Sequence, residues 1–348
     1  MSLPIRPPVI KPYETYVYKN VNDIKLRVDV YLPSTPNAGP LPVALYIPGG
    51  GWASVNRADY SRPLFYELLS YSFVICCMDY RLVPETSFAE LTKDLKDVEP
   101  WIRTVLPVEM EMIGTEVDGN KVVVLGGSAG GHLALLTPKL WKRLPCAILP
   151  ISAPTDMHSL PFLNRGRLST TKCWIPKCTP EFLASATDYA NPPNGFAIPL
   201  SEEDNKHPRR YLGLRIFREG VVSEVLVRGL VRGEDEKLRL PENGSATEQE
   251  INDICPYHIC TENYPPTCLV MGTGDEVFDL SHMLSFAEKL EGYGVQNEII
   301  IAEEEVHAFD IWADIDGEVH LKILRPAVKW ISQVVGLGPG SSLIDPLH

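Results

Sequence analysis

The chain has 348 residues, of which 45% are hydrophobic and 22% are charged, and its formal net charge is −13. This length allows one large domain or two ordinary ones, and the composition excludes a disordered, collagen-like or coiled-coil protein. Nucleic acids and anionic membranes require a basic surface, so we expect neither as a partner of so acidic a chain. The sequence shows no secretory h-region and no apolar run of about 18 residues, which predicts a cytoplasmic protein without a membrane span.

The first third of the chain predicts strands separated by turns and helices. Residues 13–19 and 24–32 are rich in β-formers and flank a short turn, as in a hairpin. Short continuous apolar runs are typical of strands buried on both faces of a parallel sheet, and they occur at 43–47, 73–78, 122–125, 146–151, 268–271 and 298–302. Helix-like segments alternate with them at 63–71, 88–105, 131–143, 281–290 and 319–335. This alternation predicts an α/β fold in which helices cover both faces of a mostly parallel sheet.

The alternation is interrupted between Pro154 and Pro265. This stretch is rich in proline, carries two charged runs and predicts a helical piece from 208 to 230, but no series of strands. We therefore expect a core formed by residues 1–153 and 266–348, with residues 154–265 inserted as a mainly helical lid.

The strongest chemical signal is Gly126-Gly127-Ser128-Ala129-Gly130, a G-x-S-x-G pattern directly after an apolar strand and before a helix-like segment. That context predicts a nucleophile elbow, in which a sharp turn holds the serine in a strained conformation and the neighbouring residues must be small. The positive end of the following helix favours a developing oxyanion. A phosphate-binding loop is disfavoured, because it would need a lysine that this segment lacks.

A second glycine-rich turn, Pro48-Gly49-Gly50-Gly51-Trp52, follows the strand at 43–47. An oxyanion hole requires backbone N–H groups that converge on one point, and glycines let the chain bend closely around a substrate. The same pattern also occurs in ordinary glycine turns, so the interpretation depends on the elbow that follows in the sequence.

Two polar residues near strand ends complete a predicted catalytic triad. Asp275 follows the strand at 268–271, and His307 is the one histidine of eight that comes just after a predicted sheet strand. A serine needs a base to take its proton, and the histidine base needs a carboxylate to orient it. The order Ser128, Asp275, His307 fits this fold class. Glu276 and Asp279 remain rival acids, although Asp279 is better placed to cap a helix.

A further segment, Asp79-Tyr80-Arg81-Leu82-Val83-Pro84-Glu85, precedes a helix that carries Asp94 and Trp101. Together with the glycine turn, the elbow, Asp275 and His307-Ala308-Phe309, it resembles the hormone-sensitive-lipase-like carboxylesterase branch of the α/β-hydrolases. The resemblance implies an α/β-hydrolase fold in which the N–H groups of Gly50, Gly51 and Ala129 form the oxyanion hole. Pro48 departs from the family pattern, which has a histidine that braces the loop, and the lid matches no family segment.

These features predict a serine hydrolase that cleaves a small-molecule carboxylic ester, lactone or thioester without a metal or organic cofactor. A homodimer is compatible with this prediction. Three alternatives stay open: a hydrolase or cyclase of a specialised-metabolite pathway, a kynurenine-formamidase-like amide hydrolase, and a non-enzymatic ligand receptor. The receptor is disfavoured because the triad is complete. Zinc or disulfides could use the C-x4-C pairs Cys173/Cys178 and Cys255/Cys260, but their spacing is not that of a zinc knuckle.

Overall fold

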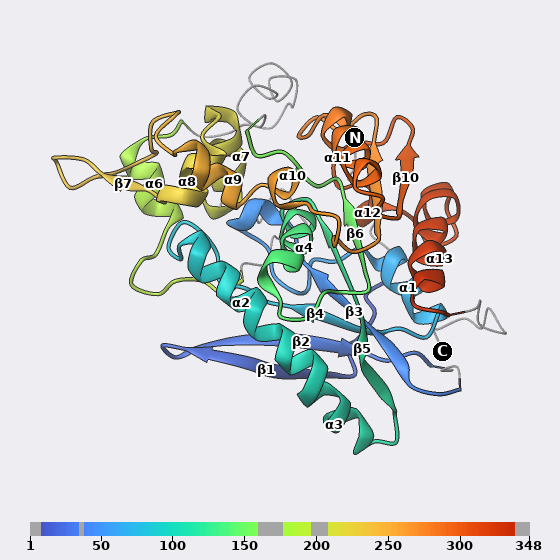
Figure 1. Ribbon diagram of the computed structural model, residues 1–348. Coiled ribbons are helices and arrows are strands. Elements are labelled where there is room, and N and C mark those ends of the chain that lie inside the picture. Colours follow the sequence, from blue (N-terminus) through green and yellow to red (C-terminus); the bar gives the residue numbers. More distant parts are fainter. Residues whose placement is uncertain (1–7, 35–37, 159–176, 196–207, 338–348) are drawn as a thin grey trace.

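The computed structural model describes residues 8–34, 38–158, 177–195 and 208–337, and Figure 1 shows a twisted sheet with helices on both faces. The eight strands run in the order β1-β2-β4-β3-β5-β6-β9-β10. β2 pairs antiparallel with β1 and β4, and all other neighbours are parallel. The strands are β1 (Glu14–Val21), β2 (Ile24–Tyr31), β3 (Leu41–Ile47), β4 (Val74–Met78), β5 (Val117–Gly127), β6 (Ala147–Ile151), β9 (Thr267–Gly272) and β10 (Asn297–Ala302). The predicted α/β class and the mostly parallel sheet are confirmed.

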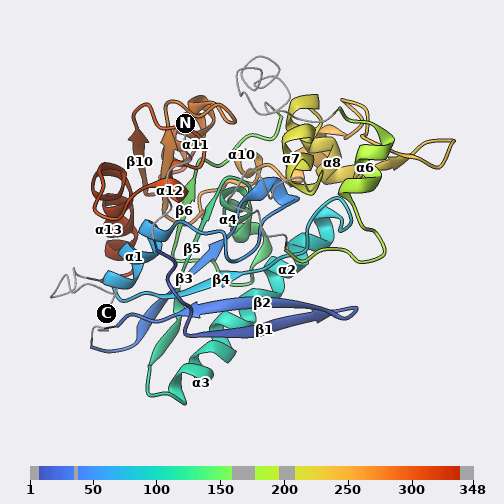
Figure 2. The same ribbon diagram turned by 180° about the vertical axis from the view of Figure 1, so that it is seen from behind.

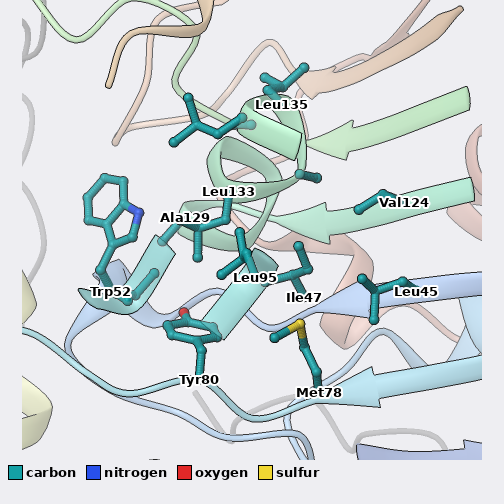
Figure 3. Packing of buried hydrophobic residues seen from close by; sticks show 14 of the residues in the cluster. Leu45, Ile47, Trp52, Met78, Tyr80, Leu95, Val124, Ala129, Leu133 and Leu135 are labelled. Atoms are coloured by element: carbon teal, nitrogen blue, oxygen red, sulfur yellow. The ribbon is translucent and has the colours of Figure 1, made fainter. Parts of the chain in front are cut away.

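The side chains of each central strand alternate between two cores, because successive residues of a strand point to opposite faces. Val43, Leu45 and Ile47 of β3 pack with α2 (Phe88–Pro100), α4 (Ala129–Leu140) and α11 (Leu280–Gly292). Figure 3 shows Leu45 and Ile47 in this core. Ala44 and Tyr46 pack on the other face with α1 (Arg62–Ser70) and α13 (Arg325–Val334). β3 and β4 are therefore buried on both faces, as their apolar runs predict, whereas the edge strand β10 is only partly buried.

Two helices that the sequence predicts as continuous begin or end with a wider turn. α2 ends at Pro100 and is followed by the π turn η2 (Trp101–Val105) and by α3 (Leu106–Glu111). The π turn η3 (His320–Leu324) likewise precedes α13. Each π turn ends two residues before a proline, Pro107 or Pro326, whose missing N–H cannot close the usual helical hydrogen bond.

In its described parts, the segment expected to form the lid contains five short helices and one hairpin, joined by irregular chain. It contains α6 (Pro180–Ala186), α7 (Pro208–Glu219), α8 (Val222–Arg228), α9 (Glu248–Asp253), α10 (Pro256–Ile259) and a hairpin of the two-residue strands β7 (Val231–Arg232) and β8 (Leu238–Arg239), which the sequence did not predict. The predicted helix 208–230 is divided at Gly220, which adopts a positive φ of 69°. Figures 1 and 2 show α6 to α9 gathered on one side of the molecule.

A buried arginine joins the segment expected to form the lid to the core. Arg209 of α7 donates to the carbonyl oxygens of Ala53 (2.6 Å) and Val83 (2.8 Å) and forms an ion pair with Glu85. α7 therefore lies against the loops that follow β3 and β4. No helix in the described ranges is long and apolar enough to cross a bilayer.

Candidate active site

Ser128 lies at the sharp junction between β5 and α4. Its φ of 52° and ψ of −124° fall outside the helical and extended regions, which is a strained conformation for a residue with a side chain. A Cβ atom at Gly130 would lie 2.0 Å from the Ile47 carbonyl oxygen, and one at Gly126 would lie 2.4 Å from the Gly130 backbone. The structure thus gives a steric reason for both glycines of the G-x-S-x-G pattern.

The structure brings Ser128, His307 and Asp275 together from three separate loops. His307 precedes the short helix α12 (Phe309–Trp312); its Nε2 lies 2.9 Å from Ser128 Oγ and its Nδ1 lies 2.8 Å from Asp275 Oδ2. An ionised carboxylate can only accept hydrogen bonds, so Nδ1 carries the ring proton and Nε2 is left to accept the proton of the serine hydroxyl. This is the geometry of an activated serine nucleophile.

Asp275 is almost completely buried but remains ionised. Burial raises the pKa of its carboxyl, but the neighbouring His307 and the N–H groups of Phe278 and Val277 outweigh this effect, and the pKa lies below its usual value. Both N–H groups donate to Oδ1, at 3.0 and 2.8 Å, which leaves Oδ2 for the histidine. The rival Asp279 caps the N-terminus of α11, where its side chain accepts from the Ser281 N–H at 3.0 Å.

Two glycines bring the loops of Asp275 and His307 into backbone contact. A Cβ at Gly272 would lie 2.1 Å from the carbonyl oxygen of Glu305, and one at Gly274 would lie 2.7 Å from that of Glu304. The Gly274 N–H donates to the Glu305 carbonyl at 3.0 Å. The close approach of the two loops, rather than loop freedom, explains the glycines around Asp275.

The glycine turn after β3 lies directly against the elbow. A Cβ at Gly49 would lie 2.8 Å from the Gly127 carbonyl oxygen and 3.4 Å from the Ser128 Cβ. Gly50 and Gly51 open the 3₁₀ turn η1 (Gly50–Trp52), and Ala129 is the first residue of α4. The first N–H groups of a helix have no partner within it, so those of Gly50, Gly51 and Ala129 are available to an oxyanion.

The turn is strained, and Tyr80 helps to hold it. Gly50, Gly51 and Trp52 all have a positive φ, of 74°, 59° and 58°. The Tyr80 hydroxyl donates toward the carbonyl oxygens of Pro48 (2.9 Å) and Gly49 (2.7 Å), and Figure 3 shows its side chain close to this turn. Tyr80 belongs to the segment that carries the family resemblance. The turn therefore keeps a fixed shape although Pro48 stands where the family has a histidine.

Aromatic side chains from the lid and the core surround the site. Phe217 of α7 stacks on Trp52 with ring centroids 6.1 Å apart and contacts Phe278 edge-on at 5.8 Å. Phe278 in turn contacts the His307 ring edge-on at 5.3 Å. These buried rings form an aromatic wall next to His307 and the glycine turn.

One group of described residues has the donor set of a metal site. Asp156, Cys255 and His258 place one potential ligand atom each within 4.8 Å of one another, and none belongs to the triad. Cys255 and Cys260 are free thiols, so the second C-x4-C pair forms no disulfide. In the first pair Cys178 is also free, while Cys173 lies outside the described residues.

Sequence reasoning missed three residues near the site. No role in the site is predicted from the sequence for His132, Phe217 or Phe278. His132 lies four residues after Ser128, one helical turn away, and its N–H donates to the Ser128 carbonyl at 3.0 Å. That spacing is a signal available in the sequence, whereas the position of Phe217 depends on how the lid folds over the core.

Comparison with known proteins gives three consistent findings. Residues 28–142 match the BD-FAE family model. The non-reducing polyketide synthase mapC of Penicillium brevicompactum is 29% identical over 323 residues, which cover 88% of this chain but 13% of that protein. The 5-methylorsellinic acid synthase of Aspergillus terreus is 28% identical over 339 residues, which cover 90% of this chain and again 13% of the relative. The chain thus spans about an eighth of the length of these curated relatives.

Solved structures of an esterase resemble this chain over nearly its whole length. Esterase 2 of Thermogutta terrifontis, in a form phosphoramylated by tabun, superimposes with a TM-score of 0.61 at 20% identity, covering 96% of this chain and 98% of the esterase. Its propionate-bound form gives a TM-score of 0.59 at 20% identity over the same shares. The likeness extends over the whole sheet and its flanking helices. The chain therefore has the α/β-hydrolase fold that these esterases have.

Proposed function

We propose that the protein is a serine hydrolase that cleaves a carboxylic ester or thioester through an acyl-enzyme. The observation that carries this proposal is the hydrogen-bonded series Ser128–His307–Asp275 next to the N–H groups of the glycine turn. The esterase fold of the structural neighbours supports the same reaction class.

In the proposed reaction, each group has its own step. His307 Nε2 takes the proton of Ser128 Oγ as the oxygen attacks the acyl carbon, and the imidazolium that forms is stabilised by Asp275. The negative charge on the former carbonyl oxygen is received by the N–H groups at the elbow and the glycine turn. His307 then gives its proton to the leaving alkoxide or thiolate. A water molecule, deprotonated by the same ring, releases the acid and restores Ser128.

The relatives favour an acyl group derived from a polyketide. A non-reducing polyketide synthase and a 5-methylorsellinic acid synthase match this chain over 88% and 90% of its length, so a related segment is part of both proteins. We infer that the substrate is a polyketide-derived thioester, ester or lactone. The aromatic wall of Phe217 and Phe278, which packs beside the glycine turn and His307, supports an acyl group of apolar or aromatic character. A cyclase that uses the same triad is the second candidate, because an acyl-enzyme can be attacked by a substrate hydroxyl or carbanion in place of water.

Active-site labelling tests the reaction class. A fluorophosphonate probe should form one adduct, on the peptide that contains Ser128, and Ser128→Ala should abolish both the adduct and the turnover of p-nitrophenyl acetate. Loss of a triad member commonly lowers kcat by several orders of magnitude. Labelling of another serine while Ser128 stays unmodified would contradict the proposal.

Product analysis separates the two candidates. The protein is incubated with aromatic and β-ketoacyl N-acetylcysteamine thioesters, and the products are identified by mass. Hydrolysis yields the free acid, which contains one added water, whereas cyclisation yields a product without it. An exclusively cyclised product would overturn hydrolysis as the natural outcome, although the acyl-enzyme would stand.

A further inference from the structure

His132 joins three segments of the chain that are distant in sequence. Its Nδ1 accepts a hydrogen bond from the Trp52 indole N–H at 3.2 Å, and its Nε2 lies 2.7 Å from the Ile254 carbonyl oxygen. A carbonyl can only accept, so Nε2 carries the proton and Nδ1 is free to receive the indole N–H. One buried imidazole therefore links the elbow helix α4, the glycine turn and the end of α9 in the lid.

The ring is built to stay neutral, as both bonds require. His132 is fully buried, and burial lowers the pKa of its imidazole to about 4. A protonated Nδ1 would face the indole N–H with a second donor and would break the bond to Trp52. The neutral ring with its proton on Nε2 is thus the form that satisfies both partners at ordinary pH.

The partner of His132 is the last residue of the turn that supplies the oxyanion N–H groups. Trp52 is almost completely buried, its own φ is positive, and it follows two glycines that also have a positive φ. Such a conformation persists only when its surroundings hold it in place. The Trp52 side chain is held by the His132 hydrogen bond, by an edge-on contact with the same ring at 5.3 Å and by the stacked Phe217.

Resting on the proposed function, we propose that His132 is a positioning residue for the oxyanion hole, which it fixes by holding the Trp52 indole. His132, on the elbow helix, thus holds the last residue of the turn, whereas the Tyr80 hydroxyl bonds to the carbonyl oxygens of Pro48 and Gly49. Because the same ring is bonded to the Ile254 carbonyl oxygen, the position of the ring also depends on how the lid packs against the core.

The chain offers a matched control for the indole bond. Trp141 is also buried, and its Nε1–H donates to the Leu95 carbonyl at 2.8 Å on α2, away from the glycine turn. Trp52→Phe and Trp141→Phe each remove one buried indole hydrogen bond and keep an aromatic ring. A merely structural role predicts equal effects of the two substitutions on activity, whereas a positioning role predicts an effect of Trp52→Phe alone.

The test measures kcat and KM for an activated acetate ester, and the second-order rate constant of inactivation by a fluorophosphonate, whose phosphoryl oxygen also occupies the oxyanion hole. We expect Trp52→Phe and His132→Leu to lower kcat and the inactivation rate constant by about 10- to 100-fold, less than the loss of a whole oxyanion donor, with KM changed by less than about threefold. Trp141→Phe should retain kcat within about twofold. The double variant Trp52→Phe/His132→Leu should be no slower than either single variant, because both remove the same bond.

His132→Asn tests whether a hydrogen-bond acceptor at this position is enough to restore kcat. The amide oxygen of asparagine can take the position of Nδ1 and accept from Trp52, while the bond to Ile254 is lost. This variant should recover most of the kcat that His132→Leu loses, and it keeps the test decisive if the leucine variant fails to fold. Wild-type kcat in all Trp52 and His132 variants, a change confined to KM, or an equal loss in Trp141→Phe would overturn the inference. A wild-type protein that is not labelled at Ser128 would instead overturn the proposed function.

Discussion

Asp275 and Asp279 are four residues apart, yet their surroundings give them different chemistry. The Asp275 carboxylate is buried, receives two backbone N–H groups on one oxygen and faces His307 with the other. The Asp279 carboxylate accepts from the Ser281 N–H at the start of α11. Both positions follow from local sequence: one aspartate lies just past a strand end, and the other lies just before a helix.

The two roles predict that Asp275→Asn lowers kcat, whereas Asp279→Asn affects mainly stability. Asp275→Asn should retain the fold but lower kcat by about 10³- to 10⁴-fold, because the histidine loses the anion that orients its ring and stabilises its charged form. Asp279→Asn should retain most activity and change the free energy of unfolding by about 1 kcal/mol or less, since asparagine also caps helices well. Measuring kcat and the thermal midpoint of both variants decides the matter, and an inactive Asp279→Asn beside a fully active Asp275→Asn would reverse the assignment.

Substitution of Gly130 tests whether close packing shapes the turn that carries Ser128. A Cβ there would meet the Ile47 carbonyl oxygen at 2.0 Å, and this backbone atom cannot move away without displacing β3. We expect Gly130→Ala to lower the free energy of unfolding by more than about 2 kcal/mol and to abolish labelling of Ser128. The matched control is Gly292→Ala at the end of α11, where a Cβ meets no atom within 4 Å. Alanine there should be neutral or stabilising by up to about 1 kcal/mol. Equal unfolding midpoints for the two variants would contradict the steric account of the elbow.

At the scale of elements, α7 is a described part of the lid that packs against the glycine turn. Phe217 stacks on Trp52, Arg209 bonds to the loops after β3 and β4, and a Cβ at Gly51 would lie 3.7 Å from the Gly213 Cα. The sequence predicts a helix here from its composition. It cannot predict that Gly220 ends the helix with a positive φ, nor that the helix packs on the glycine turn, because both depend on contacts with the core.

Phe217 should therefore influence which acyl group is accepted. Phe217→Ala removes one face of the aromatic wall, and a change of this size in an apolar pocket is worth about 1–3 kcal/mol in transition-state binding. We expect kcat/KM for an aromatic acyl ester to change at least about tenfold, while that for the acetate ester changes less than about threefold. Phe182→Ala in α6, a buried phenylalanine of the same lid, is the control and should leave the ratio unchanged. A uniform loss on every ester would show that Phe217 supports the catalytic machinery instead of the specificity.

At the scale of the whole molecule, the sheet and the strand ends that bring Ser128, Asp275 and His307 together could be predicted, because each rests on a local pattern. Apolar runs identify the buried strands, and Ser128, Asp275 and His307 each follow one of them. The contacts that shape the site are different, since Trp52 and His132 are 80 residues apart and Phe217 comes from the lid. Such pairs are fixed by how helices pack on the sheet, and no spacing within a single segment encodes them.

The buried His132 also connects the site to the stability of the whole fold. Burial lowers the pKa of this imidazole to about 4, whereas an unfolded chain has the ordinary value of 6.5. Below pH 6.5 the unfolded state therefore binds a proton that the folded state does not accept until the pH approaches 4. The free energy of unfolding must fall over this window, by about 3 kcal/mol from this residue alone, and the loss is complete once the pH is below the folded-state value.

His132→Asn removes that proton-binding site and leaves the other titrating groups in place. We expect the loss of unfolding free energy between pH 7 and pH 4.5 to be smaller in His132→Asn than in the wild type by about 2 kcal/mol, although the variant is the less stable protein at pH 7 because its bond to Ile254 is gone. Urea unfolding midpoints of both proteins, measured across this window, give the difference directly. Contributions from the lowered pKa values of Asp275 and His282 also reduce stability as the pH falls, but they are common to both proteins and cancel in the comparison. If the two pH profiles run parallel, His132 is protonated in the folded protein well above pH 4, and its ring cannot be the neutral acceptor that holds Trp52.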